Sequence, residues 1–159
     1  MKTLLALFIL TAGIAKAVTI SSFELPNMND GGKIYSSKTQ SNAVFVVEAY
    51  FLGCPYCNEN APNVNELAKK YASNKRVQVL DVGIDKSDSS YEEWIRRHSP
   101  NHPVLKDNKK TLISQLGTTG YPSTYVINAN GEVVFESAGV WGAEEEEGII
   151  NAIEGLLHQ

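Results

Sequence analysis

The segment that most restricts the fold is the apolar run AVFVVEAYF, from Ala43 to Phe51, which a cysteine follows three residues later. Except at Glu48, its side chains are apolar on both alternating faces. This pattern is typical of a strand inside a parallel sheet that is covered on both sides. The run VQVLDVGI, from Val77 to Ile84, has the same character. Two such runs, separated by room for a helix, predict a strand–helix–strand crossover and a domain of the α/β class.

The other segments complete this picture. We expect a helix from about Cys54 to Ser73, kinked at Pro62 because proline lacks an N–H and its ring clashes with the preceding turn. The pair Asn130-Gly131 between apolar runs is a strong hairpin signal. Hairpins are predicted in FELPNMNDGGKIY and STYVINANGEVVFESAG, and further helices in SSYEEWIRR, in TLISQLG up to Gly117 and from Ala143 to Leu157. The result is a mixed central sheet with helices on both faces and an N-terminal β-hairpin addition.

The first 17 residues have the layout of a secretory signal peptide. Lys2 precedes an apolar run from Leu4 to Ile14, and the small residues Ala15 and Ala17 follow. The run is too short to span a bilayer, which takes about 20 apolar residues. We expect export and cleavage after Ala17, with an uncleaved anchor as the alternative. Residues 18–159 then form one domain.

The charge of the chain argues against nucleic-acid binding. Its 14 Lys and Arg and 18 Asp and Glu give a formal net charge of -4, which becomes -6 when Lys2 and Lys16 leave with the leader. Such a balance offers nothing to phosphate backbones. The four glutamates from Glu144 to Glu147 suit the first turn of a helix, where acids complement the dipole, better than a metal site.

Both cysteines of the chain, Cys54 and Cys57, lie in the motif CPYC directly after the first apolar run. A purely structural disulfide is disfavoured, because closing so short a loop stabilises a domain by only about 2 kcal/mol. At an exposed helix start, free N–H groups and the dipole stabilise the thiolate of Cys54 and lower its pKa. Cys57, one turn further in, is shielded and can attack a mixed disulfide. The spacing therefore predicts thiol–disulfide exchange.

Metal binding is the competing hypothesis for this motif. A zinc site needs four ligands, and the chain has no second CXXC motif. Its histidines are His98, His102 and His158, and we interpret the first two as solvated residues of a proline-containing loop. A copper carrier that uses two thiols and one remote histidine stays open as the second functional hypothesis.

Taken together, the motifs resemble the thioredoxin superfamily, and in detail the exported TlpA/ResA-like thiol-disulfide oxidoreductases, over essentially the whole mature chain. FELPNMNDGGKIYS is similar to their N-terminal hairpin, VVEAYFLGCPYC to the strand before the redox motif, and GYPSTYVINANGEVVF to the proline-bearing strand and closing hairpin. Pro62, five residues after Cys57, matches the kink of the family's helix.

Three features depart from this family or from its neighbours. Gly53 stands where the family usually has tryptophan. The dipeptide Pro55-Tyr56 is typical of glutaredoxins, but these lack the N-terminal hairpin. Peroxiredoxins have threonine or serine where this chain has Phe51.

The resemblance implies a role for each site residue. Cys54 is the nucleophile and Cys57 the resolving thiol, and we expect no cofactor and no metal. Glu48, six residues before Cys54, exchanges a proton with Cys57, and burial should raise its pKa toward neutral. The bond between Tyr121 and Pro122 is expected to be cis, in a loop that faces Cys54 and pairs with an extended substrate chain.

Pro55 and Tyr56 are further expected substrate contacts. The resemblance favours a periplasmic reductant of protein disulfides that receives electrons from a membrane donor, for example in cytochrome c maturation. No stable membrane insertion is expected after cleavage of the leader. The direction of electron flow stays open, because the dipeptide between the cysteines tunes the reduction potential.

Overall fold

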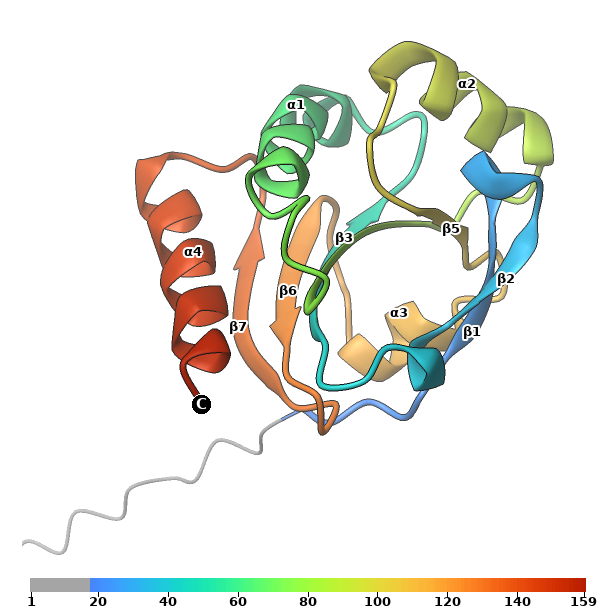
Figure 1. Cartoon of the computed structure of the whole chain (residues 1–159). Coiled ribbons are helices and arrows are strands. Elements are labelled where there is room, and N and C mark those ends of the chain that lie inside the picture. Colours follow the sequence, from blue (N-terminus) through green and yellow to red (C-terminus); the bar gives the residue numbers. More distant parts are fainter. Residues whose placement is uncertain (1–17) are drawn as a thin grey trace, which may run out of the picture.

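The structure is a computed structural model that describes residues 18–159. Its centre is a mixed seven-stranded sheet with the strand order β2-β1-β5-β4-β3-β6-β7 (Figure 1). In chain order the strands and helices are β1 (Glu24–Asn27), η1 (Met28–Asp30), β2 (Lys33–Ser36), η2 (Ser37–Thr39), β3 (Val44–Tyr50), α1 (Pro55–Lys70), β4 (Val77–Gly83), α2 (Asp88–His98), β5 (Val104–Lys106), α3 (Thr111–Leu116), β6 (Ser123–Ile127), β7 (Val133–Ala138) and α4 (Ala143–Leu157). The predicted α/β class and mixed sheet are confirmed.

β3 and β4 run parallel through the middle of this sheet, and α1 forms the crossover between them. β4 is parallel to β5 as well, with α2 as the second crossover. On its other side β3 pairs with β6 antiparallel. β3 therefore has a neighbouring strand on each edge, and helices packed on both faces of the sheet explain why its sequence is apolar on both.

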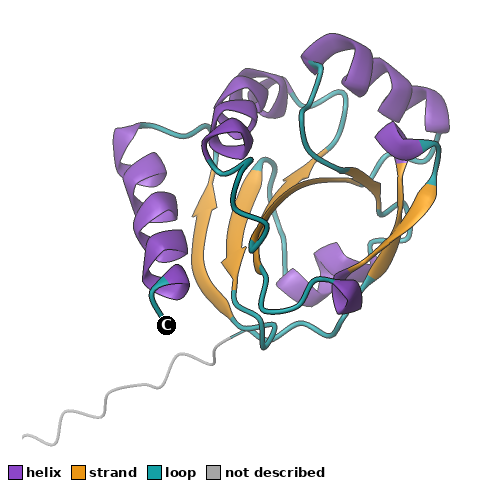
Figure 2. Cartoon of the chain, viewed as in Figure 1, coloured by secondary structure: helices purple, strands orange, loops and turns teal. Residues whose placement is uncertain are grey.

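Helices cover both faces of the sheet, as predicted (Figure 2). α3 packs on one face through Leu112, Ile113 and Leu116. The opposite face is covered by α1, α2 and α4. Because side chains alternate along a strand, β3 sends successive residues to the two faces.

Two hairpins flank the central strands. β1 and β2 pair antiparallel and join the sheet beside β5, which confirms the N-terminal hairpin. β6 and β7 form the hairpin predicted at Asn130-Gly131. Gly131 has a φ of 84°, and a Cβ there would lie 2.3 Å from the carbonyl oxygen of Ile20, so that glycine is required for two reasons. The segment from Val18 to Ile20 runs along this hairpin and bonds to it.

Helix ends agree closely with the sequence patterns. α4 spans the predicted residues, and Gly117, with a φ of 69°, ends α3. α1 begins at Pro55 and continues past Pro62 to Lys70. Among residues 18–159, no helix combines the length and apolar character needed to cross a bilayer. The predicted leader lies outside the described residues.

Candidate active site

The two cysteines lie where β3 leads into α1, at the top of the view in Figure 1. Cys54 is the N-cap of α1, with an extended backbone, and Pro55 is the first helical residue. Cys54 and Cys57 form a disulfide, and the backbone N–H of Cys57 donates to Sγ of Cys54 over 3.1 Å. A helix N-terminus and this N–H both favour negative charge on Sγ of Cys54 once the disulfide is reduced.

The expected exposure of Cys54 is wrong for the disulfide state. Cys54 is 3% exposed and Cys57 is 1% exposed. Cys54 is covered because its Sγ packs 3.7 Å from the carbonyl oxygen of Tyr121. The residues between the cysteines behave differently: Pro55 is exposed and Tyr56 is 63% exposed, so both are accessible to a partner.

The loop opposite the disulfide is the one predicted from the sequence. The peptide bond between Tyr121 and Pro122 is cis. Pro122 is buried at the head of β6, and the Tyr121 ring packs edge-on against Phe51 at a centroid distance of 5.5 Å. The loop therefore faces Cys54 and presents the backbone of Tyr121 beside its sulfur.

Glu48 lies buried under the start of α1, at 3% exposure. Oε1 accepts a hydrogen bond from Nδ2 of Asn60 at 2.8 Å, and Oε2 accepts one from Oγ1 of Thr124 at 2.6 Å. Burial raises the pKa of Glu48 to about 8; the charge of Asp81 also raises it, and the two hydrogen bonds lower it. The predicted burial and raised pKa are confirmed.

The sequence prediction did not include the residues that hold Glu48. Asn60 and Thr124 are kept in place by Trp141, whose backbone N–H donates to Oδ1 of Asn60 and whose ring N–H donates to Oγ1 of Thr124. These two hydrogen bonds fix the side-chain orientations of Asn60 and Thr124, the two residues that donate to Glu48. The available signal was that Asn60 and Thr124 are polar residues at buried positions of α1 and β6.

A second carboxylate, Asp81, lies next to Glu48 and was also missed. The two residues are register partners on the parallel strands β3 and β4, and Asp81 is 2% exposed. Its Oδ2 accepts a hydrogen bond from Nε1 of Trp94 at 2.8 Å. An acid inside the apolar run VQVLDVGI is the same kind of signal that singled out Glu48.

The interpretation of His98 and His102 as solvated residues is wrong. His102 is 7% exposed, because the loop before β5 turns its ring inward, where Nε2 lies 3.2 Å from Oδ1 of Asp81. His98 is half-buried, and its ring packs on Trp94 at a centroid distance of 4.3 Å. Within residues 18–159, no group of three or more His, Cys, Asp and Glu residues is arranged to hold a metal ion.

The profile of the AhpC/TSA family matches residues 17–136 of the chain. The protein belongs to the AhpC/TSA family. A curated relative, the thiol-disulfide oxidoreductase ResA of Bacillus thuringiensis (strain Al Hakam), is 26% identical over 124 residues, which are 78% of this chain and 70% of ResA. The thiol:disulfide interchange protein DsbE of Vibrio cholerae is 25% identical over 122 residues, or 76% of this chain and 64% of DsbE.

Solved structures show that this AhpC/TSA protein has a thioredoxin-like fold. A thiol:disulfide interchange protein of the thioredoxin family from Chlorobium tepidum TLS aligns with a TM-score of 0.73 at 19% identity, covering 91% of this chain and 99% of its own. StoA from Bacillus subtilis aligns with a TM-score of 0.68 at 18% identity, covering 82% and 97%. The resemblance to ResA-like proteins, inferred from the sequence, is confirmed, and the named relatives are thiol-disulfide oxidoreductases.

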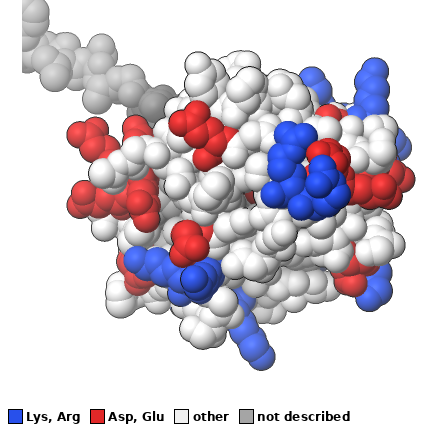
Figure 3. Space-filling view, turned by 90° about the horizontal axis from the view of Figure 1, so that it is seen from above, with Lys and Arg blue, Asp and Glu red and all other residues white. Residues whose placement is uncertain are grey.

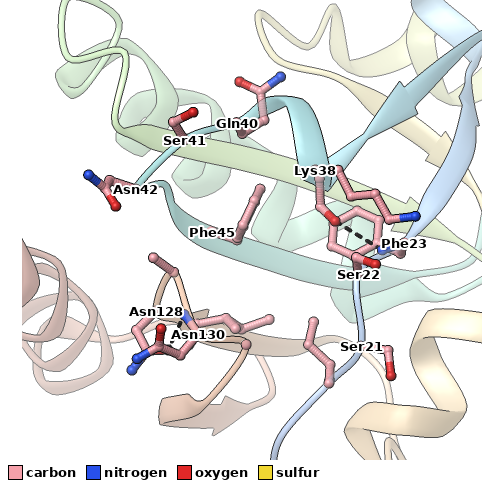
Figure 4. Close-up of a pocket in the computed structure, with 15 residues that line it drawn as sticks. Ser21, Ser22, Phe23, Lys38, Gln40, Ser41, Asn42, Phe45, Asn128 and Asn130 are labelled. Atoms are coloured by element: carbon pink, nitrogen blue, oxygen red, sulfur yellow. Dashed lines mark hydrogen bonds between the residues drawn. The ribbon is translucent and has the colours of Figure 1, made fainter.

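A hollow of about 340 Å³ lies at the opposite end of this AhpC/TSA protein from the disulfide (Figure 4). Phe23 and Phe45 line it together with polar residues of the neighbouring loops, and Lys38 is its one charged lining residue. No thiol, imidazole or carboxylate lines it. The groups capable of acid–base or redox chemistry gather instead around Cys54 and Glu48.

Proposed function

We propose that this protein is a thiol–disulfide oxidoreductase that reduces disulfides in other proteins. The observation that carries the proposal is the Cys54–Cys57 disulfide at the N-terminus of α1, with the N–H of Cys57 directed at Sγ of Cys54 and the Tyr121 backbone beside it. This arrangement distinguishes the two sulfurs, as an exchange cycle requires.

The reaction follows from that difference. In the reduced protein, the Cys54 thiolate attacks one sulfur of the substrate disulfide; an S–S bond to Cys54 forms, and the substrate S–S bond breaks. The thiolate of Cys57 then attacks Sγ of Cys54 and releases the second substrate sulfur, which takes up a proton. Two electrons pass to the substrate, and Cys54 and Cys57 end as the disulfide.

Glu48 is the group that takes the proton from Cys57. Asn60, one helical turn after Cys57 on α1, donates to the carboxylate of Glu48 and so ties Glu48 to the second turn of the helix. A pKa of about 8 leaves Glu48 able to accept and to return a proton near neutral pH. As the pH rises toward this value, the basic form becomes more abundant and the resolving step accelerates.

Substrate proteins dock against the loop of Tyr121 and Pro122. An extended chain that pairs with the backbone of Tyr121 lies close to Sγ of Cys54, which is 3.7 Å from the Tyr121 carbonyl. Pro55 and Tyr56 are exposed beside it and contact the same chain. Seen from above, this end of the molecule has broad uncharged areas between small groups of acidic and basic side chains (Figure 3).

The leader and the named relatives support the remaining assignments. The first 17 residues have the layout of a signal peptide, which supports export to the periplasm and cleavage after Ala17. A reductant in that oxidising compartment needs a membrane electron donor. Preparation of haem-binding thiols for cytochrome c fits a protein of the ResA and DsbE type.

Insulin reduction by the protein, with dithiothreitol as the electron source, tests the exchange activity. We expect reduction by the wild type, none by Cys54→Ser, and accumulation of a mixed disulfide by Cys57→Ser. A parallel Cu(I) titration of the reduced protein tests the alternative. Tight stoichiometric copper binding without insulin reduction contradicts the enzyme and favours the copper carrier.

The direction of electron flow is tested separately by equilibration with glutathione buffers. A reductant is expected to have a potential near the thioredoxin value of about -270 mV, whereas a value near about -120 mV identifies an oxidant.

A further inference from the structure

The buried face around Glu48 contains a charge pair that the exchange mechanism does not use. Asp81 and His102 are 2% and 7% exposed, and Nε2 of His102 lies 3.2 Å from Oδ1 of Asp81. Neither atom has a hydrogen-bond partner among the described residues, since even this short contact is not aligned as a hydrogen bond. The contact is therefore an ion pair only when the imidazole carries a proton.

The position of Asp81 makes this pair a neighbour of Glu48. Glu48 and Asp81 are register partners on adjacent parallel strands, which lie about 5 Å apart, and their side chains point to the same face. Two carboxylates so close in a buried site oppose each other's ionisation. The charge of Asp81 accordingly adds to the raised pKa of Glu48.

We propose that Asp81 and His102 are positioning residues that set how tightly Glu48 holds its proton. Asp81 opposes the ionisation of Glu48. A proton on His102 offsets the charge of Asp81 and so makes ionisation of Glu48 easier. The inference rests on the proposed proton role of Glu48, because the pair affects exchange only through that carboxyl group.

The surroundings of the three residues favour this assignment. Other titratable groups on this face are Tyr50 on β3, Cys57 on α1, and Tyr91 and His98 on α2, with Asp85 and Arg97 further out. β6 and the segment before α4 contribute Thr124 and Trp141, which do not titrate. Burial lowers the pKa of His98, and its Nε2 contacts Asn58. His102 is the basic side chain directly opposite Asp81.

His102 also borders the surface. It lines a hollow of about 370 Å³ between the end of α1 and the start of β4, together with Asn101 and Pro103. This hollow lies at the end of the sheet where β4 starts, remote from the disulfide, so that solvent can approach His102 without passing Cys54.

The test measures the titration midpoint of Glu48 in the oxidised protein, by carbon-13 NMR of labelled glutamate carboxyl groups. Its signal is assigned by its loss in Glu48→Gln. We expect Asp81→Asn to lower the midpoint by about one pH unit and His102→Gln to raise it by about as much. The double variant, which lacks both charges, should return close to the wild-type midpoint. His98→Gln, the matched control, should leave it unchanged.

The opposite signs separate this role from a structural one. Loss of packing alone lowers the stability of both variants, but it does not predict shifts of the Glu48 midpoint in opposite directions. Shifts in the same direction, or no shift in either variant, overturn the inference. The side-chain amide oxygen in Asp81→Asn can still accept the Trp94 hydrogen bond. If Asp81→Asn nevertheless fails to fold, the direction of the Glu48 midpoint shift in His102→Gln alone tests the inference.

Exchange kinetics distinguish this inference from the proposed function. The pH profile of mixed-disulfide resolution, recorded for the same variants, should follow the Glu48 midpoint. If the Glu48 midpoint moves as expected but the pH profile of resolution does not, the inference about Asp81 and His102 is supported. The proposed proton role of Glu48 in exchange is then contradicted. An unmoved midpoint overturns the inference whatever the exchange rate does.

Discussion

The two faces of the central sheet are equally buried but chemically different. Toward α3, the strands β3 and β4 present no ionisable side chain: apolar residues such as Val47, Leu80 and Val82 fill this face, and Gln78 is its one polar residue on these strands. Toward α1, α2 and α4, the same strands present Glu48 and Asp81 among apolar neighbours. Because residues alternate along a strand, each strand can stabilise the fold with one face and carry ionisable groups on the other. On the second face, burial raises the pKa of Glu48 as well as stabilising the fold.

The way each buried carboxylate is held supports this distinction. Near α3, Asp107 is also buried, but it accepts backbone N–H donors from Thr111, Leu112 and Ile113. Backbone donors at the start of a helix fix a carboxylate as part of the scaffold. Glu48 is instead held by two side chains, Asn60 and Thr124. The following predictions test whether the two faces differ as this comparison requires.

The largest expected effect is on the pH dependence of stability in Glu48→Gln. The pKa of Glu48 is about 8 in the folded protein and near its ordinary value of 4.5 when unfolded. The folded state therefore holds a proton that the unfolded state has lost, and stability falls as the pH rises between these values. The shift corresponds to at most about 5 kcal/mol.

Urea unfolding of the oxidised wild type and Glu48→Gln, measured at several pH values in this window, checks the prediction. The variant should lose much less stability than the wild type as the pH increases. Glutamine can still accept from Asn60 and donate to the second lone pair of the Thr124 hydroxyl, which preserves the network. Equal pH slopes in the two proteins would contradict a raised pKa at Glu48.

Truncation of a side chain on the face toward α3 should lower stability without changing its pH dependence or the exchange activity. Leu80 is fully buried in the cluster toward α3. Leu80→Ala should lower the free energy of unfolding by about 2–5 kcal/mol, by the same amount at every pH. Insulin reduction per folded molecule should stay at the wild-type level. A loss that depends on pH, or a changed exchange rate, would show that the faces are not separable.

A smaller effect is expected at a glycine of the second face that leaves no room for a side chain. A Cβ at Gly83 would lie 2.6 Å from the Tyr91 ring and 2.8 Å from the Tyr50 ring, and both tyrosines are fully buried. Gly83→Ala should therefore destabilise the protein by about 1–3 kcal/mol. Gly155→Ala in α4, which meets no atom within 4 Å, is the control and should be neutral or stabilising. Thermal unfolding of both variants decides; equal effects would contradict the tight packing.

The smallest effect is expected at Asp107. Asp107→Asn keeps the shape of the side chain but offers one acceptor oxygen instead of two to the start of α3. We expect a loss of about 1 kcal/mol, measured by urea unfolding. The pH profile of disulfide exchange should not move. A shifted profile would mean that this carboxylate belongs to the redox chemistry as well.

Local sequence patterns were sufficient for most of the fold. The strand positions other than that of β5, both hairpins and the extent of α4 follow from alternation, turn residues and helical periodicity, which act over short distances. The buried state of Glu48 follows for the same reason, since its neighbours on β3 are apolar. The cis bond before Pro122 was expected only from the family resemblance.

The missed features depend on contacts between distant parts of the chain. His102 was assigned to solvent because its loop is polar, and only the packing of that loop over β4 brings it to Asp81. Similarly, Trp141 reaches Asn60 across 81 residues of sequence. The cover over Cys54 comes from Tyr121, 67 residues away. Such contacts depend on the three-dimensional arrangement of distant segments, which local sequence patterns do not predict.

The attachment of Val18 to the closing hairpin determines how the enzyme can be oriented. Val18 and Ile20 bond to Val133 and Gly131 at the end of the sheet where β3 starts, whereas Cys54 follows the end of β3, about 20 Å away. The described chain thus begins at the pole opposite the disulfide (Figure 1). An attachment of the domain through Val18 would therefore place the anchoring point and the reactive sulfur at opposite ends of the sheet.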